Sequence, residues 1–177
     1  MLAPIKIPET TPATELIDGR LVQKMSPKFR HQELELRWTL ALRAWANGRG
    51  RATFEWRHEF TAPGHRFASL VPDVAYLNEE SVAALGPAGS ESPDLAPDVA
   101  VEILSAGESE SRLKWKIGAY LSAGTKVVFV VDPPRRTVVA HAAGGVQRFG
   151  PGETVCHSSL PGFAIAIDAM FEGLYLG

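Results

Sequence analysis

Hydrophobic side chains recur at helical spacing in two long segments of this chain. The first segment begins at Ser26-Pro27 and ends near the glycines at positions 48 and 50. Its apolar residues stand at i, i+4, i+7, i+8 and i+11, which is one face of a helix: Leu34, Trp38, Ala41, Leu42 and Trp45. The second segment covers residues 110–123 and has four apolar residues on one face: Leu113, Ile117, Tyr120 and Leu121. Each segment therefore predicts a helix with one face to bury against another layer.

The other apolar runs are short and predict strands. Residues 15–24 predict a hairpin, because Asp18-Gly19 separates two apolar pairs and is a strong signal for a tight turn. Residues 51–61 alternate and predict one half-buried strand, whose inner face carries Ala52, Phe54, Trp56 and Phe60. Further strands are predicted at 73–78, 99–104, 127–131, 137–140, 146–149 and 163–167. The nearly continuous apolar runs at 99–104 and 127–131 are typical of strands that are covered on both faces.

This order of elements predicts a mixed β-sheet flanked by helices, in the α/β or α+β class. Residues 99–131 form a strand, a helix and a second strand, which predicts a right-handed βαβ crossover. Residues 79–97 are rich in Gly, Pro and Ser and predict a loop with one helical turn at 80–85. Asp168 is expected to cap a short C-terminal helix. Residues 1–14 hold three prolines and three threonines and predict a flexible arm, followed by a single domain over 15–177.

Length, charge and cysteine content narrow the class of protein. A chain of 177 residues can bury one sizeable core, and its net charge of −2 gives no overall attraction for nucleic acid. Any nucleic-acid binding must therefore depend on a local patch. The single cysteine, Cys156, excludes an internal disulfide and a cysteine zinc cluster, and the five histidines lack the spacing of zinc ligands. No apolar run approaches the ~20 residues of a membrane span, and the N-terminus has no secretory pattern. We therefore expect a cytoplasmic protein with no membrane partner, and the frequent Ala, Gly and Arg indicate a bacterial source.

Two carboxylates stand in apolar strand segments. Asp73 follows Pro72 at the start of one predicted strand, and Glu102 lies inside the run 99–104. A buried carboxylate is costly without a partner, but two on adjacent strands could face each other across ~5 Å and share a divalent cation. That arrangement suits metal-dependent hydrolysis of phosphodiesters. Asp98 is a competitor, but along the strand it stands ~13 Å from Glu102, which is too far to bind the same ion.

Each candidate also has a purely structural interpretation. Asp73 could cap a Pro-Asp turn, and Glu102 could lie on an edge strand and face solvent. A hydrolytic site needs a cation to orient water and to offset charge on the phosphate. Lys114 and Lys116 on the following helix border its apolar face on opposite sides, so the helical pattern does not choose between them. Either lysine could equally belong to a solvated flank of the helix.

Several segments together resemble the Uma-type restriction endonuclease family, which belongs to the PD-(D/E)XK nuclease superfamily. They are residues 97–105 (PDVAVEILS), Lys116 with Tyr120, Gly124 and residues 130–133 (VVDP). Residues 15–22 (ELIDGRLV), 25–27 (MSP), His31 and residues 159–163 (SLPGF) are also similar to that family. The resemblance covers roughly residues 15–172, and it depends on the order and spacing of these segments rather than on any single motif.

The resemblance implies a restriction-endonuclease-like fold and a DNA endonuclease that uses Mg²⁺, with Mn²⁺ as a substitute. It assigns the metal to Asp73, Glu102 and the carbonyl of Ile103, and it assigns to Lys116 the orientation of the attacking water. Glu15 matches a recurrent N-terminal Glu that points into the site. There are two departures from the pattern: Leu104 stands where the superfamily often has its lysine, and Arg112 stands where the family often has an acid.

Other functions and partners stay open on the sequence. The chain could be a catalytically inactive nuclease-fold module in nucleic-acid binding or protein assembly, or a metal-dependent phosphatase. A homodimer is expected if both DNA strands are cut. His58 is expected as a core histidine, and Trp115 as an exposed partner surface. A basic set could line a phosphate backbone: Arg49, Arg51, Arg57, His65 and Arg66.

Overall fold

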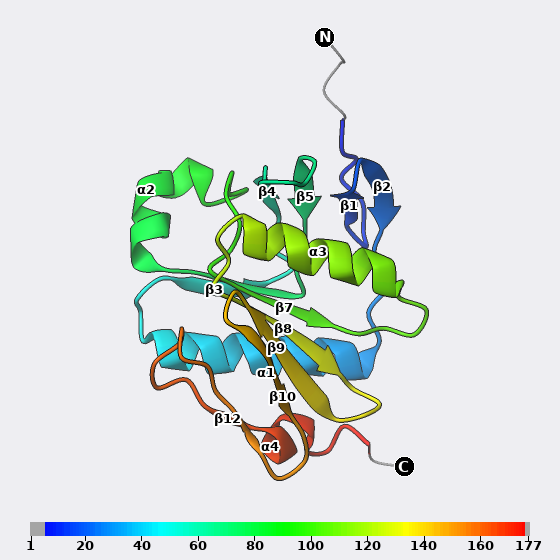
Figure 1. The fold of residues 1–177 in the computed structure, drawn as a ribbon, viewed down its shortest axis with the longest axis vertical. Helices are drawn as coiled ribbons and strands as arrows, with labels where there is room; N and C mark the ends of the chain where they lie inside the picture. Colours follow the sequence, from blue (N-terminus) through cyan, green and yellow to red (C-terminus); the bar gives the residue numbers. More distant parts are fainter. Residues whose placement is uncertain (1–5, 176–177) are drawn as a thin grey trace.

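The computed structural model describes residues 6–175 and contains a six-stranded central sheet in the order β10-β9-β8-β7-β6-β3. The strands are β3 (Arg51–Phe54), β6 (Val74–Leu77), β7 (Val99–Ile103), β8 (Val127–Asp132), β9 (Thr137–Ala142) and β10 (Gly145–Phe149). Only the β7–β8 pair is parallel, and its connection runs through α3 (Glu110–Ser122), as the predicted βαβ unit requires. Helix α1 (Phe29–Ala46) lies on one face of this sheet and α3 on the other (Figure 1).

A second, smaller sheet stands beside the first, with the strand order β2-β1-β5-β4. Its strands are β1 (Thr14–Ile17), β2 (Arg20–Gln23), β4 (His58–Phe60) and β5 (Ala68–Leu70). The β1–β2 pair is the predicted hairpin, and Asp18 and Gly19 take the left-handed conformation that its two-residue turn requires. The remaining elements are α2 (Glu79–Gly89), α4 (Ile167–Phe171) and the short pair β11 (Thr154–Val155) and β12 (Ile165–Ala166).

The apolar faces predicted from the sequence form the two layers of the core. Trp38 of α1 is fully buried, with its ring 5.0 Å from that of Phe129 on β8. On the opposite face, the ring of Tyr120 on α3 lies 5.8 Å from that of Phe60. Every residue of β7 and β8 is buried, because helices cover both faces of these strands. The predicted class, a mixed sheet flanked by helices, is confirmed.

The predicted strand over 51–61 is wrong, because the chain breaks there and enters two different sheets. Glu55 has a φ of 52°, which ends β3 in the central sheet before β4 begins in the small one. Phe54 is consequently 51% exposed instead of buried, while Trp56 and Phe60 are buried as predicted. The alternation of apolar residues continued across the break because each of the two strands buries one face.

Two further segments differ from their predicted structure. Residues 79–97 begin with a full helix, α2, because the side chain of Asn78 accepts a hydrogen bond from the backbone of Ser81 and caps it. This helix is kinked at Gly86, just before Pro87. Within the described C-terminal segment only Ile165 and Ala166 of the predicted strand 163–167 form a strand, and α4 starts two residues earlier than expected. Asp168 therefore lies in the first turn of α4 rather than at its cap.

The predicted arm over residues 1–14 lies partly outside the described residues, and residues 6–13 form neither helix nor strand. Within the described range, no helix is long and apolar enough to cross a membrane.

His58 is fully buried beside Trp56. Its burial predicts that the stability of the folded protein depends on pH. Its Nδ1 lies 3.0 Å from the carbonyl of Leu95, so Nδ1 carries the proton, and its buried Nε2 has no partner. Burial lowers the pKa of His58 from 6.5 to about 4. Between these values the unfolded chain binds a proton that the folded protein does not, so stability falls as the pH drops. At about 1.4 kcal/mol per pH unit, we expect a loss of about 3 kcal/mol between pH 7.5 and pH 4.

Urea unfolding at several pH values, on the wild type and on His58→Phe, measures this effect. The phenylalanine variant lacks the titrating group, so the difference between the two curves isolates His58 from the other histidines. Parallel curves for the two proteins over this pH range would contradict the prediction.

Candidate active site

The pairing of β6 with β7 places Asp73 opposite Glu102. Val74 pairs with Val101 in this antiparallel register. Asp73, the residue before Val74, therefore lies opposite Glu102, the residue after Val101. Both carboxylates are only 3% exposed, and the Ile103 N–H donates a 2.6 Å hydrogen bond to Asp73 Oδ2. Glu102 therefore lies inside the sheet and not on a solvated edge. Asp98, the competing acid, binds Asn78 and Lys126 instead and has no contact with this pair.

Helix α3 supplies the partners of Glu102. Lys116 Nζ lies 2.6 Å from Glu102 Oε2, and the Tyr120 hydroxyl donates a 3.0 Å hydrogen bond to Glu102 Oε1. These two residues are four positions apart, so they stand one above the other on the buried face of the helix. Lys114 is exposed, which settles the choice that the helical pattern left open. Glu15 of β1 joins the group, because its Oε1 lies 3.1 Å from Lys116 Nζ and accepts the Val71 N–H.

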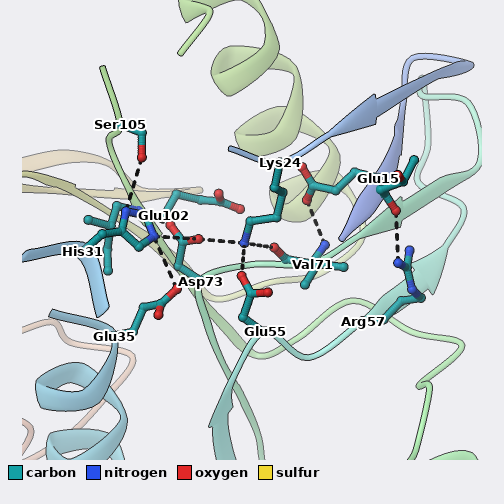
Figure 2. A network of polar contacts seen from close by, with 12 residues as sticks. Glu15, Lys24, His31, Glu35, Glu55, Arg57, Val71, Asp73, Glu102 and Ser105 are labelled. Atoms are coloured by element: carbon teal, nitrogen blue, oxygen red, sulfur yellow. Dashed lines mark hydrogen bonds and ion pairs between the residues drawn. The ribbon is translucent and has the colours of Figure 1, made fainter. Parts of the chain in front are cut away.

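On its other side Asp73 contacts a second set of charged groups. Lys24 Nζ lies 2.8 Å from Asp73 Oδ1 and 2.7 Å from Glu55 Oε1, and it also donates to the Val71 carbonyl. His31 Nε2, in the first turn of α1 as predicted, lies 3.3 Å from Asp73 Oδ1. Figure 2 shows His31 and Lys24 approaching this carboxylate together. Asp73 therefore lies between two groups of side chains. Glu102 and its partners on α3 lie on one side, and Lys24, Glu55 and His31 lie on the other.

Sequence reasoning missed Glu35, Lys24 and Glu55. Glu35 had a detectable signal, because it stands four residues after His31 on α1 and directly beside the apolar stripe. Lys24 and Glu55 had no such signal in the sequence. Lys24 follows the β1–β2 hairpin and Glu55 follows β3, and only the tertiary fold brings these two segments to Asp73. In the described part of the chain, donor atoms of His31, Glu35 and Asp73 lie within 4.8 Å of one another, close enough to hold a metal ion.

Burial and charge act against each other throughout the site. Burial raises the pKa of Glu102 to about 8, although the adjacent Lys116 acts to lower it. For Asp73 burial also favours the neutral form, but Lys24 and His31 outweigh it and hold the pKa well below its usual range. Burial would lower the pKa of His31, yet Asp73 and Glu35 raise it to about 10. Asp73 is therefore ionised at neutral pH. Near Glu102 the positive charge is too small to offset the effect of burial on its pKa.

The carboxylates line a cavity of about 90 Å³, and a larger hollow of about 420 Å³ lies next to it. Ile17, Val22 and Arg112 line both. The larger hollow also has Arg20 and Trp115 in its wall. Arg112, which departs from the family pattern, therefore stands where the cavity of the buried carboxylates meets the larger hollow.

Two predicted surface features have structural contacts. Trp115 is only partly exposed, since it packs edge-on against His65, with 5.4 Å between ring centroids, and against the core beneath α3. Within the predicted basic set, Arg57 donates to Ser69 and to the Thr14 carbonyl, and Arg49 donates to the Ala46 carbonyl. Arg57 therefore connects two strands of the small sheet, and Arg49 binds the C-terminal end of α1.

Comparison with known proteins gives a family and a related structure. The family described as "Uma2: Putative restriction endonuclease" matches residues 4–168. The crystal structure of a "putative nuclease belonging to DUF820" from Anabaena variabilis ATCC 29413 is 26% identical, with a TM-score of 0.80 over 93% of each chain. No curated protein matches. The similarity spans both sheets, and with them every element that carries the carboxylates and Lys116.

Proposed function

This chain belongs to the Uma2 family, and from that premise we propose that it is a Mg²⁺-dependent endonuclease that hydrolyses phosphodiester bonds of DNA. One observation carries the proposal. Asp73 and Glu102 face each other on adjacent strands, and the ammonium of Lys116 lies 2.6 Å from Glu102. The structural relative described as a nuclease supports the same reaction class.

The donor set fits a hard divalent cation. In the proposal Asp73, Glu102 and the carbonyl of Ile103 hold Mg²⁺ or Mn²⁺, which prefer oxygen ligands and keep several waters. Burial raises the pKa of Glu102 to about 8, so this buried pair lacks positive charge that a divalent ion would supply. When bound, the ion lowers the pKa of a coordinated water and polarises the phosphodiester.

The side chains around the carboxylates have separate tasks. Burial would lower the pKa of Lys116, but Glu102 and Glu15 raise it above its usual value, so this lysine stays charged. A charged ammonium can orient the attacking water and stabilise the charge that develops on the phosphorane. Glu15 holds Lys116 in place and is itself fixed by the Val71 N–H. Solvent protonates the leaving 3′ oxygen.

The groove next to the cavity supports a polymeric substrate. Arg112 and Arg20 place positive charge in its wall, and Trp115 adds an aromatic surface. Arginines position a nucleic-acid backbone through its phosphates without reading its sequence. This open groove favours DNA over the small substrate of a phosphatase, which would need an enclosed pocket. Cutting both strands requires two sites, so the proposal includes a homodimer.

A second function also needs a test, because each proposed carboxylate ligand already has a lysine as its partner. Lys24 pairs with Asp73, and Lys116 pairs with both Glu102 and Glu15. Such pairs could hold the fold without any catalysis, as in an inactive module for nucleic-acid binding or protein assembly. Metal binding separates the two functions.

Calorimetric titration of Mg²⁺ and Mn²⁺, with a plasmid-nicking assay on the same samples, tests the proposal. We expect Asp73→Asn to lower metal affinity by at least about tenfold and to lose nicking in parallel. Asp94→Asn is the matched control, because Asp94 also follows a proline but lies exposed in the loop after α2. If wild-type protein binds neither ion, with or without DNA, the catalytic proposal fails and the inactive module stands.

A further inference from the structure

Helix α1 carries two potential metal ligands that the proposed Mg²⁺ site does not use. His31 and Glu35 are four residues apart, so both side chains lie on the same face of the helix, directed at Asp73. We propose that His31, Glu35 and Asp73 form a second cation site, for a divalent transition-metal ion that accepts one nitrogen ligand, such as Zn²⁺ or Mn²⁺. The inference rests on the proposed function only in that Asp73 would serve both sites.

The three donor groups are close together before any ion is bound. His31 Nε2 lies 3.3 Å from Asp73 Oδ1 and 3.3 Å from Glu35 Oε1. One donor atom from each residue can be chosen so that all lie within 4.8 Å of one another. Figure 2 shows the imidazole between the two carboxylates. Small side-chain movements would therefore direct all three groups at a common point.

Glu35 is a buried carboxylate with only one weak polar partner. Its side chain is only 7% exposed, and its buried Oε1 has the imidazole of His31 at 3.3 Å but accepts no hydrogen bond of good geometry. An unsatisfied buried polar atom is rare in folded proteins and costs about 1–3 kcal/mol, more when the group is charged. Glu35 packs within the stripe that meets the sheet, where an apolar residue would serve packing better. A cation at this position would satisfy the oxygen.

The donor types select the kind of ion. Mg²⁺ and Ca²⁺ are bound almost wholly by oxygen, whereas an imidazole nitrogen suits Zn²⁺ and related ions. The two carboxylates of this site suit Mn²⁺ as well, which makes Mn²⁺ a usable paramagnetic probe. Three protein ligands leave open positions for water or a phosphate oxygen, as in catalytic zinc sites.

The surroundings of the site also suit an ion there. Ser105 Oγ lies 3.3 Å from His31 Nδ1 and can accept its proton. The ion would then take the place of the Nε2 proton that Asp73 and Glu35 retain, so binding would release this proton. Lys24 competes for Asp73 Oδ1, but Glu55 and the Val71 carbonyl can retain its ammonium when the carboxylate turns to a metal.

Electron paramagnetic resonance of added Mn²⁺ tests the site directly. We expect wild-type protein to bind Mn²⁺ with a ¹⁴N coupling in the pulsed spectrum, which reports an imidazole ligand. His31→Gln should abolish this coupling, and Glu35→Gln should weaken Mn²⁺ binding at least tenfold. His141→Gln, on β9, is the matched histidine control and should leave the coupling unchanged. Thermal unfolding of each variant verifies that it is folded.

The outcomes separate this inference from the proposed nuclease function. Mn²⁺ bound without ¹⁴N coupling in wild type, no Mn²⁺ binding, or a coupling that survives in His31→Gln would overturn the second site. His31 would then be the charged partner of Glu35 and Asp73. Mg²⁺-dependent nicking without ¹⁴N coupling would leave the nuclease intact and remove only the second site. A nitrogen-coupled Mn²⁺ in a protein that nicks no DNA would support the second site and overturn the proposed nuclease function.

Discussion

Exchange of Glu102 for glutamine is expected to lower the rate of DNA nicking by about a thousandfold. Glutamine keeps the shape of the side chain and an oxygen for the Tyr120 hydroxyl, but it removes the negative charge that holds the cation. A loss of about 4 kcal/mol of transition-state stabilisation corresponds to about a thousandfold in rate. Single-turnover nicking of supercoiled plasmid at saturating Mg²⁺ measures this rate.

The folded state should tolerate this change, which separates a catalytic role from a structural one. Burial raises the pKa of Glu102 to about 8, so the folded protein disfavours the charge that glutamine removes. The unfolding midpoint is therefore expected to stay the same or rise. Glu108→Gln is the control, because Glu108 lines the same cavity but makes no contact with Asp73 or Lys116 within hydrogen-bond distance. Undiminished nicking by a folded Glu102→Gln protein would exclude Glu102 as a ligand.

The sequence was sufficient to predict the central sheet and the two carboxylates because both depend on local patterns. Val99–Ile103 is apolar at every position but one, and that exception is Glu102. An apolar run that is buried on both faces is typical of the middle of a sheet, so the pattern favoured an internal Glu102 over the edge-strand alternative. Asp73 was predicted as its partner on the condition that the two strands pair, and the register of β6 with β7 meets that condition.

The rest of the site could not be predicted, because it depends on how the two sheets meet. The break at Glu55 leaves the alternation of apolar residues unchanged, so the sequence does not show that β3 and β4 belong to different sheets. This break brings Glu55 to Lys24, whose hairpin is distant along the chain. The lysine on α3 was equally ambiguous, since Lys114 and Lys116 both flank the apolar face. On the sequence only the family resemblance selected Lys116, and the structure places Glu102 and Glu15 beneath the helix beside it.

Lys116→Met is expected to have the largest effect on stability, about 3–5 kcal/mol. Methionine fills a similar volume, but it leaves Glu102 and Glu15 buried with no cation between them. Removal of one partner from a buried ion pair costs this much because the remaining charge has lost both water and its counter-ion. Urea unfolding at pH 9, above the pKa of about 8 at which Glu102 loses its proton in the folded protein, gives the free energy. The same sample should lose nicking because water is no longer oriented.

A double variant identifies the origin of that loss. If uncompensated charge is the cause, Glu102→Gln added to Lys116→Met should recover a large part of the lost stability, because only Glu15 then lacks a partner. If the cause were lost packing of the lysine chain, the second substitution would recover nothing. Nicking should remain absent in both variants, since the double variant lacks a proposed metal ligand as well. Recovered stability without recovered activity would show that Lys116 balances the charge of a site whose carboxylates are present for catalysis and not for the fold.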